Sequence, residues 1–438
     1  MNYYLNNNYT RNKDIVKKVV LIITIALTSI IFQINLGSLE MYETGSIWLA
    51  LLLNVSLIFI SLIINGVDFV TLFIFCINLL LFPITIQFFT GTSYGDLQAN
   101  IVPLNLPKLY TYSYIYCTCF LLLSLLFAFK SHEIRTIKVK LPNYSSQVII
   151  FNNIIAIIFT FVAFPRLGFS INNIDNRFDM LLPGHAWNQL AIVALLFNLP
   201  YLRKNVTVKL TYLFVLCWFL MNGERADITG LVFGLFLFYF IKTSQERSPI
   251  KTVELFALLF LFVILLNLIA SWRGGEHSTI IESINKLLVT PTTSDVAYLY
   301  NVSIDMISKF GKLHGKIFLA NLISAIPLSS PVDFSSTVDN FGYLNPGGEP
   351  ILAEPIVDFG VKGLYLLSFI DFIFYRFFVQ FKNSFFKYEF LVLLCSVPRI
   401  VWYGRYYAYS SLLFFVPFMF IADYLINNPK CQFKLERK

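Results

Sequence analysis

The stretch "FLMNGERADITGLVF", residues 219–233, places three ionisable side chains between two strongly apolar runs. Glu224, Arg225 and Asp227 stand close together, and almost every residue on either side of them is hydrophobic. Charged groups are costly in hydrocarbon, so they gather at membrane surfaces or in polar cavities. The stretch therefore predicts a tight turn at a membrane surface, with one helix ending before it and another beginning after it.

Apolar runs of the same kind recur along the whole chain. Hydrophobic residues make up 57% of its 438 residues and charged residues only 13%, with a mean hydropathy of +0.69. A helix needs about 20 apolar residues to cross the hydrocarbon core. We therefore predict an all-α, polytopic integral membrane protein in which residues 1–438 form a single transmembrane domain. The net charge of +8 fits basic cytoplasmic loops, and we expect no nucleic-acid partner.

The runs predict about 12 transmembrane helices. Most Lys and Arg residues fall in alternate connections, such as the one holding Lys130, Arg135, Lys138 and Lys140. Basic residues favour the cytoplasmic side, so we expect both termini in the cytoplasm. The first run lacks a cleavage site and reads as a retained helix. The predicted spans are residues 19–36, 46–64, 67–89, 110–129, 147–164, 186–202, 209–222, 227–241, 253–271, 360–380, 388–403 and 407–426.

One connection, residues 272–359, is far longer than the others and lies on the outer side in this topology. Long segments of ordinary composition are usually functional. Its stretch "DVAYLYNVSIDMISKF", residues 295–310, has apolar residues at helical spacing and predicts an amphipathic helix on the membrane surface or across the bundle end. Two interpretations stay open for this helix: it packs on its own neighbours, or it forms a lid that shapes a substrate site.

Arginine dominates the outer side of the predicted bundle. Apart from Lys108, the cations of the short outer connections are all arginines, and Arg273 is the second residue of the long one. The guanidinium group binds phosphate oxygens in pairs and tolerates partial dehydration. Each arginine alone could equally snorkel to headgroups or pair with an acid, but the set predicts a site for a lipid phosphate or pyrophosphate. The candidates are Arg166, Arg177, Arg225, Arg273, Arg399 and Arg405.

Sequence motifs for cofactors and metals are absent from the chain. It contains no P-loop, no dinucleotide-binding glycine fingerprint, no His-Glu-x-x-His pair and no nucleophile elbow. The four histidines, at 132, 185, 277 and 314, are widely scattered. We therefore expect no cofactor and no metal, and a chemistry that depends on carboxylates, a histidine and arginines.

The long connection ends in "NPGGEPILAEPIVDFGVKGLYLLSF", residues 345–369. With this stretch the chain resembles the Wzy-type oligosaccharide repeat-unit polymerases, also called O-antigen or capsule polymerases. The resemblance covers the topology and three motifs: a Gly-x-Arg-like turn, an Arg after the next span, and a closing Glu-x-x-x-Asp-Phe-Gly-x-x-Gly. Glu224 occupies the middle of the turn, which departs slightly from the family pattern. The matching residues are Gly223, Arg225, Arg273, Glu354, Asp358, Phe359, Gly360 and Gly363.

The resemblance implies a glycosyltransferase of the bacterial inner membrane. Such an enzyme moves a growing glycan from undecaprenyl pyrophosphate onto a single lipid-linked repeat unit at the outer leaflet, without nucleotide sugars. Arg225 and Arg273 are the preferred pyrophosphate ligands. The favoured general base is Glu354 or His277, followed by Glu349 and Asp358. The resemblance also implies membrane lipids and a chain-length regulator of the polysaccharide co-polymerase kind as partners.

Three other functions remain open from the residues alone. A lipid-linked oligosaccharide flippase would need charges along a central path, and Asp371, near the middle of a predicted span, is the main charge of that kind. An O-antigen ligase would share the layout and use a loop histidine, such as His277 or His314. A scaffold of an export complex would use the long connection for docking, but it leaves the arginine bias unexplained.

Overall fold

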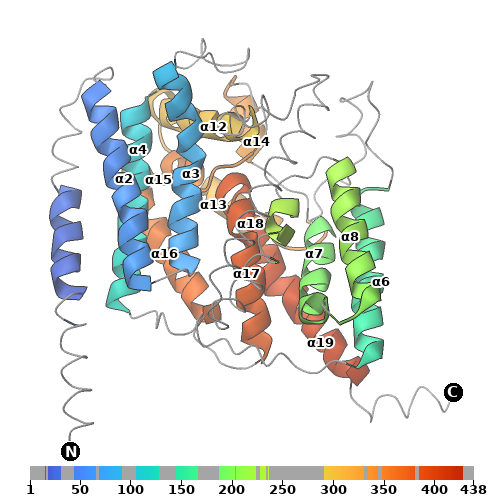
Figure 1. Ribbon diagram of the computed structural model, residues 1–438. Coiled ribbons are helices and arrows are strands. Elements are labelled where there is room, and N and C mark those ends of the chain that lie inside the picture. The colour runs from blue at the N-terminus through green and yellow to red at the C-terminus, as the bar shows by residue number, and fades with distance from the viewer. Residues whose placement is uncertain are drawn as a thin grey trace, which may run out of the picture.

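The computed structural model describes residues 15, 18–30, 44–65, 69–90, 105–127, 145–165, 187–202, 204–222, 227–232, 235, 291–329, 334–343, 348–379 and 384–427. Every regular element in these ranges is a helix (Figure 1). The β-type pairing in these ranges is one isolated parallel β-bridge, which joins Glu349 and Tyr403. The predicted all-α class is therefore confirmed for the described part of the chain.

Long helices run side by side and form the body of the protein (Figure 1). Helices α2, α3, α4 and α16 gather on one side and α6, α7 and α8 on the other, with α17 between them and α19 running obliquely towards the lower end of α6. Because α17 packs against both α3 and α7, it joins the two groups. The bounds are α2 (Thr44–Asn65), α3 (Phe69–Thr90), α4 (Leu106–Leu126), α6 (Ser146–Ala163), α7 (Trp187–Asn198), α8 (Val206–Met221), α16 (Val361–Val379), α17 (Ser384–Tyr403) and α19 (Val416–Asn427).

Polar caps fix the first turns of three of these helices. The side chains of Asn105, Ser145 and Asn205 accept hydrogen bonds from backbone N–H groups at the starts of α4, α6 and α8. Such caps satisfy donors that the helix itself leaves open. The helices therefore begin within a few residues of the starts predicted from hydropathy, at residues 110, 147 and 209.

Several described helices have the length and composition of membrane spans. Three of them are long and apolar enough to cross a membrane: Leu106–Leu126, Ser146–Ala163 and the continuous helical stretch Tyr406–Asn427. Shorter apolar helices cover Lys18–Ile30, Ile47–Leu62, Phe69–Phe82 and Val206–Met221. These helices support integration into a membrane, while the total of about 12 spans stays a prediction.

Helix α16 shows how the bundle inverts the usual polarity of a protein surface. Its buried face carries Asp371 together with Leu364, Phe372 and Tyr375. Its opposite face exposes a continuous apolar stripe at helical spacing, formed by Val361, Tyr365, Phe369, Ile373 and Phe377. A charged group inside and large apolar groups outside are what a lipid environment favours.

The predicted outer connection contains four described helices. They are α12 (Pro291–Phe310), α13 (Lys316–Ser324), α14 (Phe334–Asn340) and α15 (Ala353–Phe359), and α12 and α14 lie at one end of the bundle (Figure 1). The predicted amphipathic helix is present as α12. Ala297 and Tyr300 face the main core, whereas Leu299, Val302 and Met306 join a second apolar cluster with α14 and α15. Helix α12 is therefore packed between other parts of the protein on both faces.

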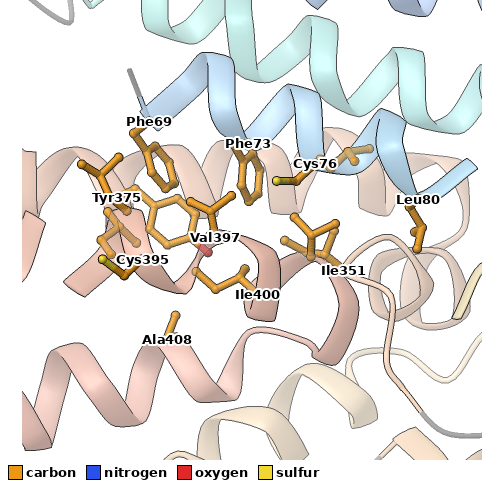
Figure 2. Close-up of a cluster of buried hydrophobic side chains, with 14 of the residues drawn as sticks. Phe69, Phe73, Cys76, Leu80, Ile351, Tyr375, Cys395, Val397, Ile400 and Ala408 are labelled. Atoms are coloured by element: carbon orange, nitrogen blue, oxygen red, sulfur yellow. The ribbon is translucent and has the colours of Figure 1, made fainter. Parts of the chain in front are cut away.

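The main apolar core reaches up to the segment that precedes α15. Figure 2 shows Phe69, Phe73, Cys76 and Leu80 of α3 facing residues of α16, α17 and the segment around Ile351. The rings of Phe69 and Tyr375 meet edge to face, with 4.9 Å between centroids. Ile351 is fully buried in this core, so the segment around residues 349–352 is anchored against the bundle.

Candidate functional site

A buried ionic cluster forms around Arg405, at the break between α17 and α18 (Tyr406–Ser410). Its Nε donates to Asp371 Oδ1 at 2.9 Å, and its Nη2 lies 2.8 Å from Asp371 Oδ2. Its Nη1 donates to Glu354 Oε2 at 3.0 Å and to the carbonyl oxygen of Ile351 at 2.9 Å. The hydroxyl of Tyr116 on α4 also donates to Asp371. The guanidinium group therefore joins the segment at residues 351–354 to α16, and α4 is linked to it through Asp371.

A glycine permits the break that positions Arg405. Gly404 has a φ of +87°, a conformation that residues with a side chain rarely adopt. A Cβ at this position would also lie 2.8 Å from Cδ of Glu349. The carboxylate of Glu349 thus packs directly on the backbone next to Arg405.

Asn321 of α13 links the two glutamates of the site. Its Nδ2 donates to Glu349 Oε1 at 2.8 Å and to Glu354 Oε2 at 2.7 Å. Glu354 is fully buried, and its other oxygen, Oε1, accepts no hydrogen bond from any residue the structure describes. Burial raises the pKa of Glu354 to about 6, although the nearby Arg405 guanidinium acts in the opposite direction. A carboxyl group with a pKa near neutrality can exchange a proton under working conditions.

Asp358 has a different role from Glu354, although the two stand four residues apart. Its carboxylate oxygens accept hydrogen bonds from the backbone N–H groups of Ile317 (3.2 Å) and Phe318 (2.8 Å). Burial raises the pKa of Asp358, and these N–H groups oppose that rise. Asp358 therefore caps the first turn of α13.

The glycines of the closing motif make the corner between α15 and α16. Gly360 ends α15 with a φ of +70°. A Cβ on Gly363 would lie 2.1 Å from the carbonyl oxygen of Pro355, a separation that no side chain tolerates. The motif residues thus divide between the ionic cluster (Glu354), a helix cap (Asp358) and a close helix corner (Gly360 and Gly363).

Arg399, near the end of α17, belongs to a second polar group. Its Nη1 lies 3.0 Å from Oδ1 of Asp227. Asp227 also accepts hydrogen bonds from the amides of Asn188 and, at 2.8 Å, Gln189 of α7. On another side, the Arg399 guanidinium carbon lies 4.5 Å from the ring centroid of Tyr403 and 4.1 Å from that of Tyr407. This cation is therefore oriented by an acid and by two aromatic faces.

Glu349 lies between the two polar groups. Its backbone N–H donates to the carbonyl oxygen of Trp402 at 3.0 Å, and its backbone bridges to Tyr403, whose ring underlies Arg399. Tyr406 lies within electrostatic reach of both Glu349 and Arg399. Glu349 is 5% exposed and Arg399 6% exposed, whereas Glu354 and Arg405 are fully enclosed. The edge of the site nearest the surface thus carries one acid, one arginine and half-buried tyrosines.

Four of the ten predicted site residues come together in this region: Glu349, Glu354, Arg399 and Arg405. The fifth described candidate, Asp358, binds the start of α13. The other five, Arg166, Arg177, Arg225, Arg273 and His277, lie outside the described residues, so their convergence stays a prediction. Arg405 was expected to contact pyrophosphate, but its guanidinium is enclosed here by protein carboxylates.

Several residues of the site were not among the predicted site residues. Asp371 was conspicuous as an acid in a predicted span, and its partners are Arg405 and Tyr116. Asn321, Asn188 and Gln189 gave no signal, because a lone amide in a polar or apolar stretch is common. Among the described residues, no group of three or more His, Cys, Asp or Glu side chains could hold a metal ion.

Compared with family models, with curated proteins and with solved structures, the chain matches none of them.

Proposed function

We propose that this protein is a bacterial polymerase of lipid-linked oligosaccharide repeat units. It would transfer a growing glycan from undecaprenyl pyrophosphate onto a second lipid-linked unit, at the outer leaflet of the inner membrane, to build an O-antigen or capsule. The proposal includes about 12 spans, cytoplasmic termini and an outer segment at residues 272–359. One observation carries it: the closing stretch of that segment brings Glu354 against Arg405, and it brings Glu349 against the backbone of Gly404 and next to Tyr403, whose ring lies under Arg399.

The chemistry requires a base and a charge that stabilises the leaving group. The acceptor hydroxyl attacks the anomeric carbon of the donor glycan, and the bond from this carbon to the pyrophosphate oxygen breaks. The hydroxyl proton passes to a carboxylate, and the electron pair leaves with the pyrophosphate. Arginines that face the departing phosphate stabilise the charge it gains, and they act more strongly where water is excluded.

We assign the general base to Glu349. Its carboxylate lies at the edge of the site, close to the half-buried tyrosines, so an acceptor sugar that approaches them meets it first. Glu354 lies behind Asn321 and is fully enclosed, so it acts on Glu349 through the shared amide. His277 is the alternative base that the sequence offers, and it lies outside the described residues.

We assign phosphate binding to Arg399, together with Arg225 and Arg273 as predicted from the motifs. Asp227 and the rings of Tyr403 and Tyr407 fix the plane of the Arg399 guanidinium before any ligand arrives. A cation held in this way loses little conformational freedom on binding. Arg405 has a positioning role instead, because it holds Asp371, Glu354 and the Ile351 carbonyl in place.

The flippase alternative needs charges along a path through the bundle. The main candidate for such a charge, Asp371, is bound by Arg405 and Tyr116 within the cluster that also holds Glu354. Its burial is therefore accounted for by its two partners in the ionic cluster. Among the described residues, we find no contact or charge that favours the flippase or the scaffold over the polymerase.

The deciding experiment uses the purified full-length chain in liposomes with a lipid-pyrophosphate-linked repeat unit from its own strain. The polymerase predicts a ladder of longer lipid-linked glycans without added nucleotide sugar. A substrate that stays one unit long and crosses the sealed bilayer would establish the flippase instead. Transfer to added lipid A core, with no ladder, would establish the ligase.

A further inference from the structure

Helix α13 has two faces of opposite character. Its inner stripe, Ile317, Asn321 and Ser324, is buried. Along the other side run Leu319, Leu322, Ile323 and Ile326, which are spaced as one continuous helical stripe. Leu319 is 57% exposed, Ile323 48% and Ile326 50%, and Leu328 just beyond the helix is more exposed still. The polar side chain thus points into the protein and the aliphatic ones point away from it.

Both ends of α13 are fastened to the site. Asp358 binds its first turn, and the carbonyl oxygen of Ala325, at its end, accepts a hydrogen bond from Ser410 of α18 at 2.9 Å. Between these ends, Asn321 bridges Glu349 and Glu354. A single helix therefore covers the two acids with one face and presents an aliphatic stripe on the other.

The composition around the stripe is typical of a membrane interface. Lys312 and Lys316, both exposed, flank the start of the helix, and the aliphatic residues follow. Basic residues beside an exposed aliphatic face suit an element whose polar end meets phosphate headgroups and whose face meets acyl or isoprenoid chains. Exposed aliphatic stripes on water-facing surfaces are uncommon without a partner.

We propose that the aliphatic stripe of α13, residues Leu319, Leu322, Ile323, Ile326 and Leu328, binds the polyprenyl chain of the lipid-linked substrate. This inference rests on the proposed function, because it takes the substrate to be a lipid-linked glycan. The sugar–phosphate bond must reach Glu349 while the chain stays in hydrocarbon. Helix α13 satisfies both conditions within its own width, since Asn321 contacts Glu349 and the stripe faces outward.

The test uses the full-length protein in nanodiscs of phosphatidylethanolamine and phosphatidylglycerol. The probe is a polyprenyl pyrophosphate with a photoreactive diazirine in its chain, and labelled peptides are located by mass spectrometry. We expect labelling between residues 316 and 329. An excess of unlabelled polyprenyl pyrophosphate should reduce it at least tenfold, while additional phospholipid should leave it unchanged.

Two matched variants sharpen the test. Leu319→Ser combined with Ile323→Ser removes the centre of the stripe without touching the buried face, and labelling of the helix should fall about tenfold. Leu52→Ser with Phe59→Ser makes the same change on the exposed face of α2, and labelling of α13 should be unaltered. Both variants change only exposed positions, and their thermal stability is compared first to confirm that the fold is retained.

Two results would overturn the inference. Labelling of α13 that phospholipid suppresses as well as polyprenyl pyrophosphate does would show contact with bulk lipid only. Labelling confined to other helices would place the chain elsewhere. Labelling needs no turnover. If α13 is labelled but no polymer forms, the binding of the polyprenyl chain to α13 is supported and the polymerase function is refuted. If polymer forms but α13 is not labelled, only the binding of the chain to α13 is refuted.

Discussion

Nη2 of Arg405 lies 2.8 Å from Oδ2 of Asp371, and both side chains are fully buried. This pair connects the start of α18 to the middle of α16, and Glu354 joins it from α15. Removing one partner of such a pair leaves the other charge without compensation, which costs far more than losing an exposed pair. The pair between Arg405 and Asp371 therefore supports the structure of the site. Substitutions of either residue should first lower the free energy of unfolding.

Arg405→Ala should destabilise the protein by about 3–5 kcal/mol, because two buried acids lose their cation. The measurement is thermal or chemical unfolding of the purified protein in one detergent. Lys309→Ala is the matched control, since it opens the partly exposed pair with Asp305, which is 2.7 Å long. The control should change stability by roughly 0.5 kcal/mol or less. Equal effects of the two variants would contradict the buried role of Arg405.

Arg399 offers a test of phosphate binding that can be separated from stability. Arg399→Ala should lower polymer formation at least tenfold, and Arg399→Lys should restore it only in part, because an ammonium group lacks the planar fork. Arg399→Ala also removes the guanidinium group that pairs with the buried Asp227. The double variant with Asp227→Asn should therefore recover stability without recovering activity. Recovery of both would assign Arg399 to structure alone.

The raised pKa of Glu354 makes two predictions about pH. The folded-state pKa is about 6 against an ordinary value of 4.5, so the folded protein holds this proton more firmly than the unfolded chain. The stabilisation is complete below pH 4.5 and is lost as the pH rises towards 6, by about 2 kcal/mol in all. Activity should instead rise through pH 6, as Glu354 ionises beside Arg405. In Glu354→Gln both inflections should disappear from the unfolding and activity profiles; inflections that persist there belong to another group.

The corner between α15 and α16 should not accept a methyl group at residue 363. Gly363→Ala would bring a Cβ to 2.1 Å from the Pro355 carbonyl oxygen, so we expect a loss of about 3 kcal/mol or more. Gly342→Ala is the comparison, because Gly342 has a φ of +78° and open space around it. Its cost should be about 1 kcal/mol, from backbone strain alone. A larger loss in Gly342→Ala, measured by unfolding, would refute the packing argument.

The predicted topology can be tested with single cysteines in a cysteine-free background. Lys312→Cys, in the predicted outer segment, should react in intact cells with a thiol reagent that cannot cross the inner membrane. Lys204→Cys, in a predicted cytoplasmic turn, should react only after lysis. Both positions are exposed, so differences in labelling report the side of the membrane. The reverse pattern would invert the orientation of the bundle.

Helical class and element starts followed from the sequence because hydropathy and capping are local properties. Residues Asn105, Ser145 and Asn205 illustrate this, since each caps a helix near its predicted start. The closing motif was also visible, and it supplies Glu354 to the ionic cluster. Asp358 shows what local signals miss: the sequence offered it as a candidate base, whereas its carboxylate caps α13, some 40 residues earlier in the chain.

The partners of the site could not be read from the sequence for a related reason. Asn321 contacts Glu349 and Glu354 only because α13 folds back over them, and nothing local distinguishes it from other asparagines. An acid among apolar residues indicates a buried partner for Asp371. Which residue that partner is, Arg405, depends on how α16 and α17 pack. Contacts between distant segments require the tertiary arrangement, which hydropathy does not contain.

The contact between Gly363 and the Pro355 carbonyl has a mechanical consequence. This contact makes the corner between α15 and α16 rigid. Glu354 lies on α15 and Asp371 on α16, and both form ion pairs with Arg405. A bulky glycan therefore cannot enter by changing the angle between α15 and α16. The element that can move is then α13. It is held over Glu349 and Glu354 by the amide of Asn321 and by hydrogen bonds at its two ends. Under the proposed function, entry and release of the glycan should therefore depend on how readily α13 moves away from the two acids.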